Sequence, residues 1–360
     1  MPKKAKIAMV GAGGMGQLAH LQNYVSINKC EVVALAEWRP RLREKMREFH
    51  NIPHVFPTVE SMLESGLEID AVVAAMHHAN HINVVPQILQ AKKHLLTEKP
   101  LAISIENGER LVKMAKDNGV LYAIGCQRNS DPAMEYAKKV ITEMRESGEY
   151  GQMRIVKSIM PLGDWMYGFR RTNDFGMKYP WVGTDEVAPY AELEQPPSCF
   201  TEDEYRVYNH YIGFLCHQFS AVRYLLGENY RVVYADNRET VIIGKSESGI
   251  PCSIERNTFT NTTAWMEELF VGFDKAFIKL EMPPPFSLNK AGVVTVMRDN
   301  GKEPPTLTTP IMPNVHSFYM QAVNFVLAVL GERDLACPAE SNLEDLKVSK
   351  QCIDMMKLDK

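Results

Sequence analysis

The sequence feature that most constrains the fold is a glycine pattern near the N-terminus. Residues 11–16 read Gly-Ala-Gly-Gly-Met-Gly and fit the pattern G-x-G-x-x-G. The pattern follows an apolar run at Lys6–Val10, which indicates a strand, and it opens a segment at Met15–Ile27, which indicates a helix. In that setting the glycines let the backbone approach a pyrophosphate at the helix N-terminus. The sequence therefore predicts a dinucleotide site; the alternative is a glycine-rich turn without a ligand.

The predicted dinucleotide site extends beyond this turn. Glu37 ends the predicted strand Glu31–Ala36, twenty-one residues after Gly16, where a carboxylate would bond the adenosine ribose hydroxyls. Glu37 would repel a 2′-phosphate, which favours NAD as the cofactor. Arg39 could hold that phosphate, so NADP stays open as the less favoured alternative. The cofactor-binding residues predicted here are Gly11, Gly13, Gly14, Met15, Gly16, Glu37, Trp38 and Arg39.

The spacing of apolar runs changes near Gly125. Before it, short apolar runs alternate with amphipathic segments, which predicts a parallel sheet covered by helices on both faces. After it, strands joined by short turns predict a mostly antiparallel sheet. We expect an α/β chain with an N-terminal Rossmann doubly wound parallel sheet and a C-terminal α+β domain with a mostly antiparallel open sheet. The expected boundaries are 1–127 for the first domain, 128–340 for the second, and 341–360 for a helix that packs back on the first.

Composition excludes several classes of protein. Hydrophobic residues make up 45% and charged residues 23% of the chain, as in ordinary globular proteins. A net charge of −4 gives no electrostatic reason to expect nucleic-acid or membrane binding. No apolar run approaches the roughly 18–20 residues that span a bilayer, and the N-terminus lacks the apolar region of a signal peptide. Seven scattered cysteines without a C-x-x-C pair favour reduced thiols, so we expect a cytoplasmic protein.

A second motif, Glu98-Lys99-Pro100, follows the predicted strand His94–Thr97. Ligands of doubly wound sheets bind beyond the carboxyl ends of the strands, so Glu98 and Lys99 are expected to face the ligand cleft. A lysine there could donate to a substrate hydroxyl, and its charge state changes readily when it is desolvated. An ordinary ion pair at a strand end is the alternative.

With these motifs, the chain resembles the family of glucose–fructose oxidoreductase, inositol dehydrogenase and MocA. The family combines the glycine pattern, a histidine seventeen residues before Glu-Lys-Pro, and Glu-Lys-Pro itself; His81 and Glu98-Lys99-Pro100 match here. The resemblance continues through Ser147–Gly151, His217–Gly227 and His316–Tyr319, and so covers essentially the whole chain. It implies an active site between two domains, with Lys99 as the catalytic lysine and His217 as general base. Further cofactor-binding residues expected from this comparison are Met76, His77, His81, Glu98, Lys99 and Gln127.

The chain also departs from the family pattern. An aspartate common four residues before the histidine is replaced by Gly213, and another, three residues after it, by Ser220. His217 would then act with Lys99 alone or with help from His210 or Tyr211. The family's Thr-Pro-Asn loop reads Met76-His77-His78 here, which leaves its cofactor contacts open. The residues expected to bind substrate are Arg128, Trp165, Trp181, His210 and Tyr211.

Three functions fit this pattern. The first is a dehydrogenase that oxidises a secondary hydroxyl of a sugar, glycoside or cyclitol, within which oxidation at C3 of a glycoside to a 3-keto product is the favoured case. The second is a glycoside-cleaving enzyme that uses tightly bound NAD for transient oxidation and elimination. The third is a non-catalytic dinucleotide sensor. A metal site at His77 and His81 is disfavoured because no acidic third ligand is evident nearby. An open sheet that needs covering predicts a homo-dimer or homo-tetramer.

Overall fold

The computed structural model describes residues 3–160, 163, 165, 192–256 and 264–358. By their contacts these residues cluster into two compact units. The first contains 3–126, 192–213 and 321–346, and the second contains 127–160, 163, 165, 214–256, 264–320 and 347–358. In this division, two later stretches of chain cluster with the N-terminal residues.

The first unit is built on a six-stranded sheet in the order β3-β2-β1-β4-β5-β6, and every neighbouring pair is parallel. The central strands are buried along most of their length, as expected for a sheet covered on both faces. This confirms the predicted doubly wound parallel sheet. The strands are β1 (Ala5–Val10), β2 (Cys30–Ala36), β3 (His54–Phe56), β4 (Ala71–Ala74), β5 (His94–Thr97) and β6 (Tyr122–Ile124).

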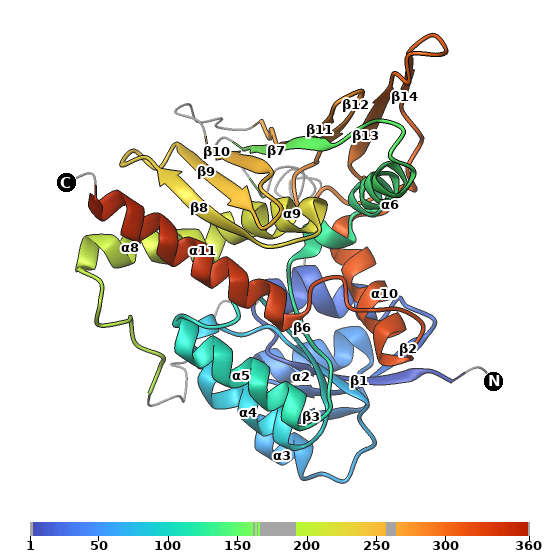
Figure 1. The fold of residues 1–360 in the computed structure, drawn as a ribbon. Coiled ribbons are helices and arrows are strands. Elements are labelled where there is room, and N and C mark those ends of the chain that lie inside the picture. Colours follow the sequence, from blue (N-terminus) through green and yellow to red (C-terminus); the bar gives the residue numbers. More distant parts are fainter. Residues whose placement is uncertain (1–2, 161–162, 164, 166–191, 257–263, 359–360) are drawn as a thin grey trace. The chain divides into compact units, whose positions relative to one another are not determined.

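The helices between these strands begin and end at recognisable signals. Ser104 caps α5 through its hydroxyl, which accepts from the Asn107 N–H, and Asn51 ends α2 in the left-handed conformation. The helix expected at Met15–Ile27 is a π-helix followed by one α-helical turn. The helical segments are η1 (Gly16–Leu21), α1 (Gln22–Tyr24), α2 (Pro40–His50), α3 (Val59–Leu63), η2 (His78–Asn80), α4 (His81–Gln90) and α5 (Ile105–Asp117); Figure 1 shows α4 beside α5.

Residues 192–213 join the first unit through a buried carboxylate. Glu194 is 5% exposed, and its oxygens accept from the backbone N–H groups of Ile103 and Ser104 at 2.9 and 2.8 Å. They also accept from the Ser104 hydroxyl and the Asn107 amide, each at 2.8 Å. Helix α8 (Glu202–His210) follows, and Tyr208 Oη donates to the Ile103 carbonyl. These bonds join a segment distant in sequence to the start of α5.

Residues 321–346 join the same unit at a different place. Asn342, at 0% exposure, accepts from the Leu101 N–H at 2.8 Å. A Cβ added to Gly108 of α5 would meet Leu343 and Leu346 at 3.1 and 3.2 Å, so this glycine permits close packing. The helices concerned are α10 (Ser317–Val329) and α11 (Ala339–Leu358), and α11 continues into the second unit.

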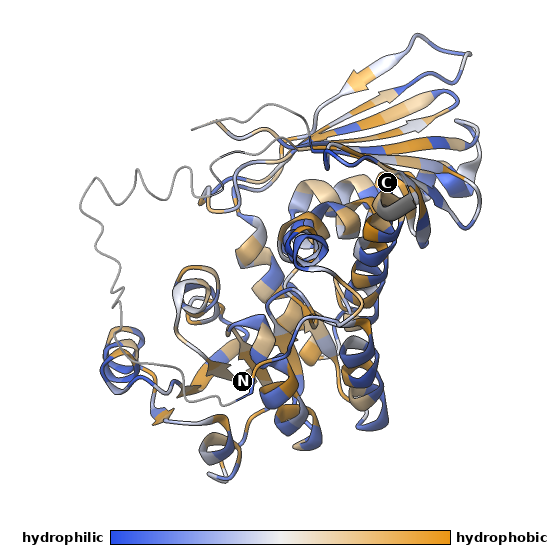
Figure 2. Cartoon of the chain, turned by 90° about the vertical axis from the view of Figure 1, so that its left-hand side faces the viewer, coloured by the Kyte–Doolittle hydropathy of each residue, from blue (hydrophilic) through white to orange (hydrophobic). Residues whose placement is uncertain are grey.

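The second unit is built on an eight-stranded sheet in the order β14-β13-β12-β11-β7-β10-β9-β8. Its neighbours are antiparallel except for the parallel pair β7–β10, which confirms the mostly antiparallel sheet. Buried and partly exposed residues alternate along strands such as β12. Figure 2 shows that the strands of this sheet carry both hydrophobic and hydrophilic residues. The strands are β7 (Met153–Ile159), β8 (Tyr230–Ala235), β9 (Val241–Ser246), β10 (Pro251–Glu255), β11 (Glu268–Phe273), β12 (Ala276–Glu281), β13 (Val293–Arg298) and β14 (Thr306–Thr308).

Two helices pack on this sheet. Helix α6 (Pro132–Ser147) contacts β12 and β13, and α9 (Cys216–Leu226) contacts β7 and β10. Asp131 caps α6 by accepting from the Ala133 N–H, and Gly148 ends it in the left-handed conformation. The short segments η3 (Gln127–Ser130) and η4 (Tyr211–Leu215) precede α6 and α9, respectively.

The buried Glu194 contacts predict a specific loss of stability. Glu194→Gln replaces an acceptor of four hydrogen bonds with an amide whose NH2 group cannot accept, so the free energy of unfolding should fall by about 1–3 kcal/mol. Urea denaturation measures this change. Glu192→Gln, which alters an exposed side chain two residues earlier, is the matched control and should leave stability unchanged. Equal stability of both variants would contradict a role of Glu194 in joining this segment to α5.

Candidate functional site

The candidate site of the first unit lies at the carboxyl ends of its central strands. Gly11 follows β1, Glu37 follows β2, Met76 lies two residues after β4, and Glu98 follows β5. These strands are consecutive in the sheet, and the chain order reverses between β1 and β4. Ligands of doubly wound sheets bind at such a reversal, beyond the carboxyl ends of the strands.

The glycine turn is packed as the motif requires. Gly11 has φ +81°, and a Cβ there would lie 2.5 Å from the Ala75 carbonyl oxygen. A Cβ on Gly16 would lie 2.4 Å from the Gly11 carbonyl oxygen. At Gly13 the nearest protein atom is Nη2 of Arg39, 3.8 Å away, so space remains above that residue. Gly11 and Gly16 are therefore fixed by the protein's own packing, whereas Gly13 leaves room for another group.

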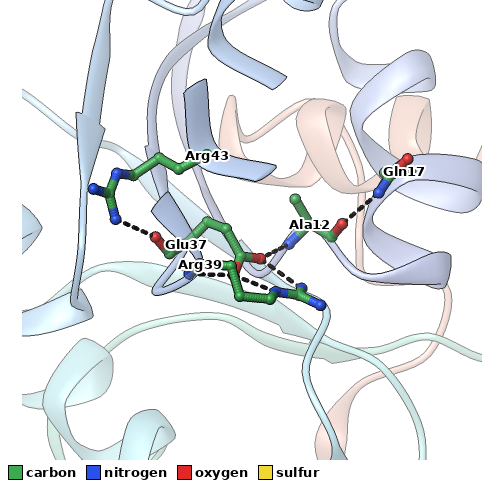
Figure 3. Close-up of polar contacts among 5 residues, drawn as sticks. All are labelled: Ala12, Gln17, Glu37, Arg39 and Arg43. Carbon is green, nitrogen blue, oxygen red and sulfur yellow. Dashed lines mark hydrogen bonds and ion pairs between the residues drawn. The ribbon is translucent and has the colours of Figure 1, made fainter. Parts of the chain in front are cut away.

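Glu37 contacts this turn directly, as Figure 3 shows. Its side chain is 0% exposed, and Oε2 accepts from the Ala12 N–H at 2.7 Å. Arg39 binds the same carboxylate through Nε at 2.7 Å and Nη2 at 2.8 Å, a two-point pairing that a guanidinium favours. Arg43 donates to the Glu37 carbonyl, and Gln17 donates to the Ala12 carbonyl. The Glu37 carboxylate, which is expected at the adenosine end of the site, is thus held by the backbone of the glycine turn and by the Arg39 guanidinium.

Arg39 is also held from a second side. Its guanidinium lies 5.4 Å from the centre of the Trp38 ring, within cation–π range. Its Nη2 is the atom nearest to the space above Gly13. Residues Glu37, Trp38 and Arg39, predicted together from the sequence, therefore form one contiguous group beside the glycine turn.

The loop after β4 carries three histidines in different environments. His77 is exposed, and its Nδ1 accepts from the Ala79 N–H at 3.3 Å. Its ring stacks on that of His78 at 4.4 Å. Burial lowers the pKa of His78 to about 4, aided by the neighbouring charges of His77, His81 and Lys99. His77 precedes the helical segments that begin at His78, so His77 and His81 do not share a continuous α-helical face.

His81 has a fixed tautomer. Its ring is buried, and burial lowers its pKa, although the hydrogen bond to the Leu101 carbonyl acts in the opposite direction. Because a carbonyl only accepts, the Nδ1 that lies 3.1 Å from the Leu101 oxygen must carry the proton. Nε2 of the neutral ring is then an acceptor. Within the described part of the chain, this Nε2 and Asn80 Oδ1 are buried without a hydrogen-bond partner.

Glu98 and Lys99 have partners that the sequence did not indicate. Glu98 Oε1 lies 2.8 Å from Nε2 of His20, which is in the π-helix η1, and both side chains are buried. Burial acts to raise the Glu98 pKa, but the His20 hydrogen bond and the charges of His20 and Lys99 outweigh it, so the pKa is lowered. Lys99 Nζ donates to the Gly213 carbonyl. Gly213, where the family resemblance led us to expect an aspartate, thus presents a backbone acceptor to the lysine.

The other predicted site residues divide between the two units. His210 and Tyr211 lie in the first unit with Lys99, half-buried and buried respectively. Gln127, Arg128, Trp165 and His217 lie in the second. Arg128 is buried against Glu267, and Trp165 is 44% exposed with its ring 5.7 Å from that of Phe286. Trp181 lies outside the described residues.

Sequence analysis missed His20, Glu194 and Glu267. His20 lies among the apolar residues of a helix and has no motif of its own. Glu194 belongs to no motif, and its role depends on contacts with residues about 90 positions away. Glu267 and Glu268 stand side by side before an apolar run, and the sequence alone does not show that Glu267 is the buried one that needs a partner.

A metal-binding cluster and a membrane-spanning helix are both absent from the described residues. No group of three or more His, Cys, Asp or Glu side chains there is placed to hold a metal ion. Among the helices of that same part of the chain, none combines the length and the apolar character needed to cross a bilayer.

Comparison with known proteins gives a family match in the first unit. Residues 5–126 match the family of glucose–fructose oxidoreductase, inositol dehydrogenase and MocA, described as an oxidoreductase family with an NAD-binding Rossmann fold. One curated relative is the myo-inositol 2-dehydrogenase of Thermotoga maritima, 24% identical over 232 residues, which are 64% of this chain and 58% of the relative. The matched regions span 41–58% of the first three curated relatives' own length.

Solved structures share the fold over nearly the whole chain. The scyllo-inositol dehydrogenase of Lactobacillus casei, with bound NAD(H) and scyllo-inositol, has a TM-score of 0.68 at 18% identity and covers 99% of this chain and 98% of its own. A 3-ketoreductase from Actinomadura kijaniata, in complex with NADP, has a TM-score of 0.64 at 16% identity and covers 97% and 96%. At 16–18% sequence identity, these two matches show a shared fold and nothing further.

The packing of the glycine turn separates two substitutions. Gly13→Ala has room within the protein, so the variant should keep wild-type stability and lose dinucleotide affinity by at least about tenfold, because the methyl group takes the space for the ligand. Gly16→Ala places a methyl group against a backbone oxygen and should lower the free energy of unfolding by about 1–3 kcal/mol or more. Thermal melting and fluorescence titration with NADH measure the two effects. Unchanged NADH affinity in Gly13→Ala would contradict the assignment of the space above Gly13 to the dinucleotide.

Proposed function

We propose that this chain is an NAD(P)-dependent dehydrogenase of the glucose–fructose oxidoreductase, inositol dehydrogenase and MocA family, whose model matches its residues 5–126. Its proposed substrate is a sugar, glycoside or cyclitol, of which it oxidises a secondary hydroxyl. The observation that carries this proposal is the arrangement of the glycine turn, Glu37 and Lys99 at the carboxyl ends of neighbouring strands of one parallel sheet.

The residues of the first unit fit a dinucleotide. The open space above Gly13 suits a pyrophosphate, and the N–H groups of the first turn of the following helix have no partner within that helix. Glu37 suits the adenosine ribose hydroxyls. At the other end, His81 Nε2 and Asn80 Oδ1 are buried acceptors that suit hydroxyl or amide donors of a nicotinamide riboside. These are the positions at which we propose that the cofactor binds.

We propose NAD as the preferred form. Both oxygens of Glu37 are engaged by Arg39, and one also accepts from the Ala12 N–H. A 2′-phosphate at the Arg39 guanidinium would lie beside the Glu37 carboxylate that this guanidinium already neutralises, so the two anions would repel each other. The ribose hydroxyls of NAD carry no charge, so they bring no second anion to the Glu37–Arg39 pair.

Lys99 and His217 are the proposed catalytic residues. The nicotinamide, when bound, supplies the carbon that accepts the hydride. Lys99 carries an ammonium that donates to the Gly213 carbonyl, so it has further N–H groups with which to polarise a substrate hydroxyl. His217 is the second residue of α9. We propose it as the general base because of its place in the family pattern.

The substrate class rests on the relatives. One is named for oxidation of myo-inositol, and another is a UDP-N-acetylglucosamine 3-dehydrogenase. We favour C3 of a glycoside within the broader class of sugars and cyclitols. Trp165 presents an exposed ring of the kind that packs on the apolar face of a pyranose.

We also propose a homo-dimer or homo-tetramer. The edge strand β14 and its neighbour β13 expose Leu307 and Val293, which are 66% and 41% accessible, and subunit contacts commonly cover such side chains. Native mass spectrometry of the purified protein reports the oligomer and any nucleotide that remains bound.

The proposed preference for NAD can be reversed. Glu37→Gln removes the negative charge that pairs with Arg39, so the ratio of NADP to NAD affinity should rise by at least about tenfold. Titration of both nucleotides by fluorescence measures this ratio. Glu44→Gln, at an exposed position of α2, is the control and should leave it unchanged. An unchanged ratio in Glu37→Gln would overturn the assigned role of this carboxylate.

The catalytic role of Lys99 gives the direct test of function. With NAD and a panel of glucosides and inositols, the wild-type protein should form NADH, whereas Lys99→Ala should lose at least about a thousandfold in kcat and keep its NAD affinity. Lys113→Ala, in an exposed pair on α5, is the control for a lost lysine charge. Absorbance of NADH follows the reaction, and nucleotide extracted from denatured protein follows a retained cofactor. Full activity of Lys99→Ala would refute the mechanism.

A further inference from the structure

A buried polar cluster lies in the second unit, around Arg128. Arg128 binds Glu267 through Nε at 3.2 Å and through Nη2, and the two side chains are 3% and 1% exposed. Gln218, next to His217, donates through Nε2 to Glu267 Oε1 at 3.0 Å. The Arg128 guanidinium also lies 5.9 Å from the centre of the Trp265 ring. One carboxylate thus holds both an arginine and a glutamine in fixed orientations.

This cluster has unused hydrogen-bonding atoms of both kinds. Among the described residues, the buried atoms without a partner include one donor of the Arg128 guanidinium, Nη1, and one acceptor of the Gln218 amide, Oε1. Gln127 Oε1, in the same segment η3 as Arg128, and Ser158 Oγ of β7 are further examples. Arg128, Gln127, Gln218 and Ser158 are each no more than 2% exposed. Buried polar atoms are normally paired, so several in adjacent elements indicate a missing polar partner.

The charge of the cluster is balanced. The single positive charge of Arg128 faces the Glu267 carboxylate at hydrogen-bond distance. Asp131, also buried, is a second carboxyl within the electrostatic reach of both. An additional anion at Arg128 would therefore meet a guanidinium that is already neutralised and a second acidic group nearby. A ligand with many hydroxyls could instead satisfy both the donor and the acceptors without adding charge.

From these contacts we infer that Glu267 determines specificity by neutralising Arg128, so that the cluster accepts an uncharged polyol and rejects a sugar acid. Glu267 acts through Arg128 and Gln218 and is a positioning residue. The inference rests on the proposed function, since it concerns the substrate of the same dehydrogenase. It narrows the proposed substrate to a neutral sugar, glycoside or cyclitol, and it predicts that removal of the Glu267 charge admits a carboxylate.

The test compares matched neutral and acidic ligands on the protein saturated with NADH. Dissociation constants are measured calorimetrically for methyl glucoside and methyl glucuronide, galactose and galacturonate, and myo-inositol. The wild type should bind at least one neutral member and prefer it to its acid. Glu267→Gln should shift that preference towards the acid by at least about tenfold, because Arg128 then has an unneutralised charge. Glu239→Gln, which breaks the Arg256 ion pair of the same unit, should leave the preference unchanged.

A second variant covers the case in which Glu267→Gln does not fold. Arg128→Lys keeps the positive charge opposite Glu267 but removes the Nη1 donor, so the neutral ligand should bind at least about tenfold more weakly while the acid remains excluded. A pair with only a structural role would leave both affinities of the folded variant unchanged, and that result overturns the inference. So does a wild type that prefers the acids, or one whose unpaired atoms bind only ordered water in the ligand complex.

The failure of the inference can be told from the failure of the proposed function. If the wild type forms NADH from a neutral polyol but folded Glu267→Gln and Arg128→Lys keep wild-type preferences, the function stands and the role of Glu267 is refuted. If the wild type neither binds nor oxidises any member of the panel, neutral or acidic, both are refuted. Oxidation of a sugar acid alone preserves the dehydrogenase and refutes the inference.

Discussion

The close approach of the backbone at Gly11 and Gly16 is the constraint on which the first unit depends. A side-chain carbon at either position would lie within about 2.5 Å of a carbonyl oxygen, so only glycine permits β1, the following turn and β4 to pack as they do. That packing brings the Ala12 N–H to the Glu37 carboxylate and sets η1 where His20 reaches Glu98. The glycine turn thereby connects Glu37, at the predicted cofactor site, with Glu98, which follows β5 beside Lys99.

Much of this arrangement was predictable from the sequence, because it follows from local signals. The parallel sheet, the mostly antiparallel sheet and most of their helices came from periodicity and turn residues, and the family was indicated by the glycines and Glu98-Lys99-Pro100. Strand β3 and helix α3 were missed because they are only three and five residues long, too short for a periodic pattern. Strand β9 begins only at Val241, because Glu239, two residues earlier, adopts a positive φ in the turn before it.

The parts of the site that could not be predicted depend on contacts distant in sequence. His20 meets Glu98 across 78 residues, Lys99 meets Gly213 across 114, and Arg128 meets Glu267 across 139. A single sequence gives the residue types but not these pairings. The Glu37–Arg39 pair is local, yet its consequence was ambiguous, because a carboxylate and a guanidinium two residues apart favour opposite cofactors until their mutual bonding is known. The roles of His217 and of the proposed substrate residues continue to rest on the family pattern.

The proposed function requires that hydride passes from a polyol carbon to a nicotinamide that the first unit binds. The most direct measurement uses glucosides and inositols deuterated at their secondary carbons, incubated with the protein and NAD, followed by denaturation and mass analysis of the released nucleotide. We expect reduced nicotinamide with one deuterium from at least one of these polyols, and the loss of this label in Lys99→Ala. Nucleotide that remains oxidised and unlabelled with every polyol, although it is bound, would contradict it.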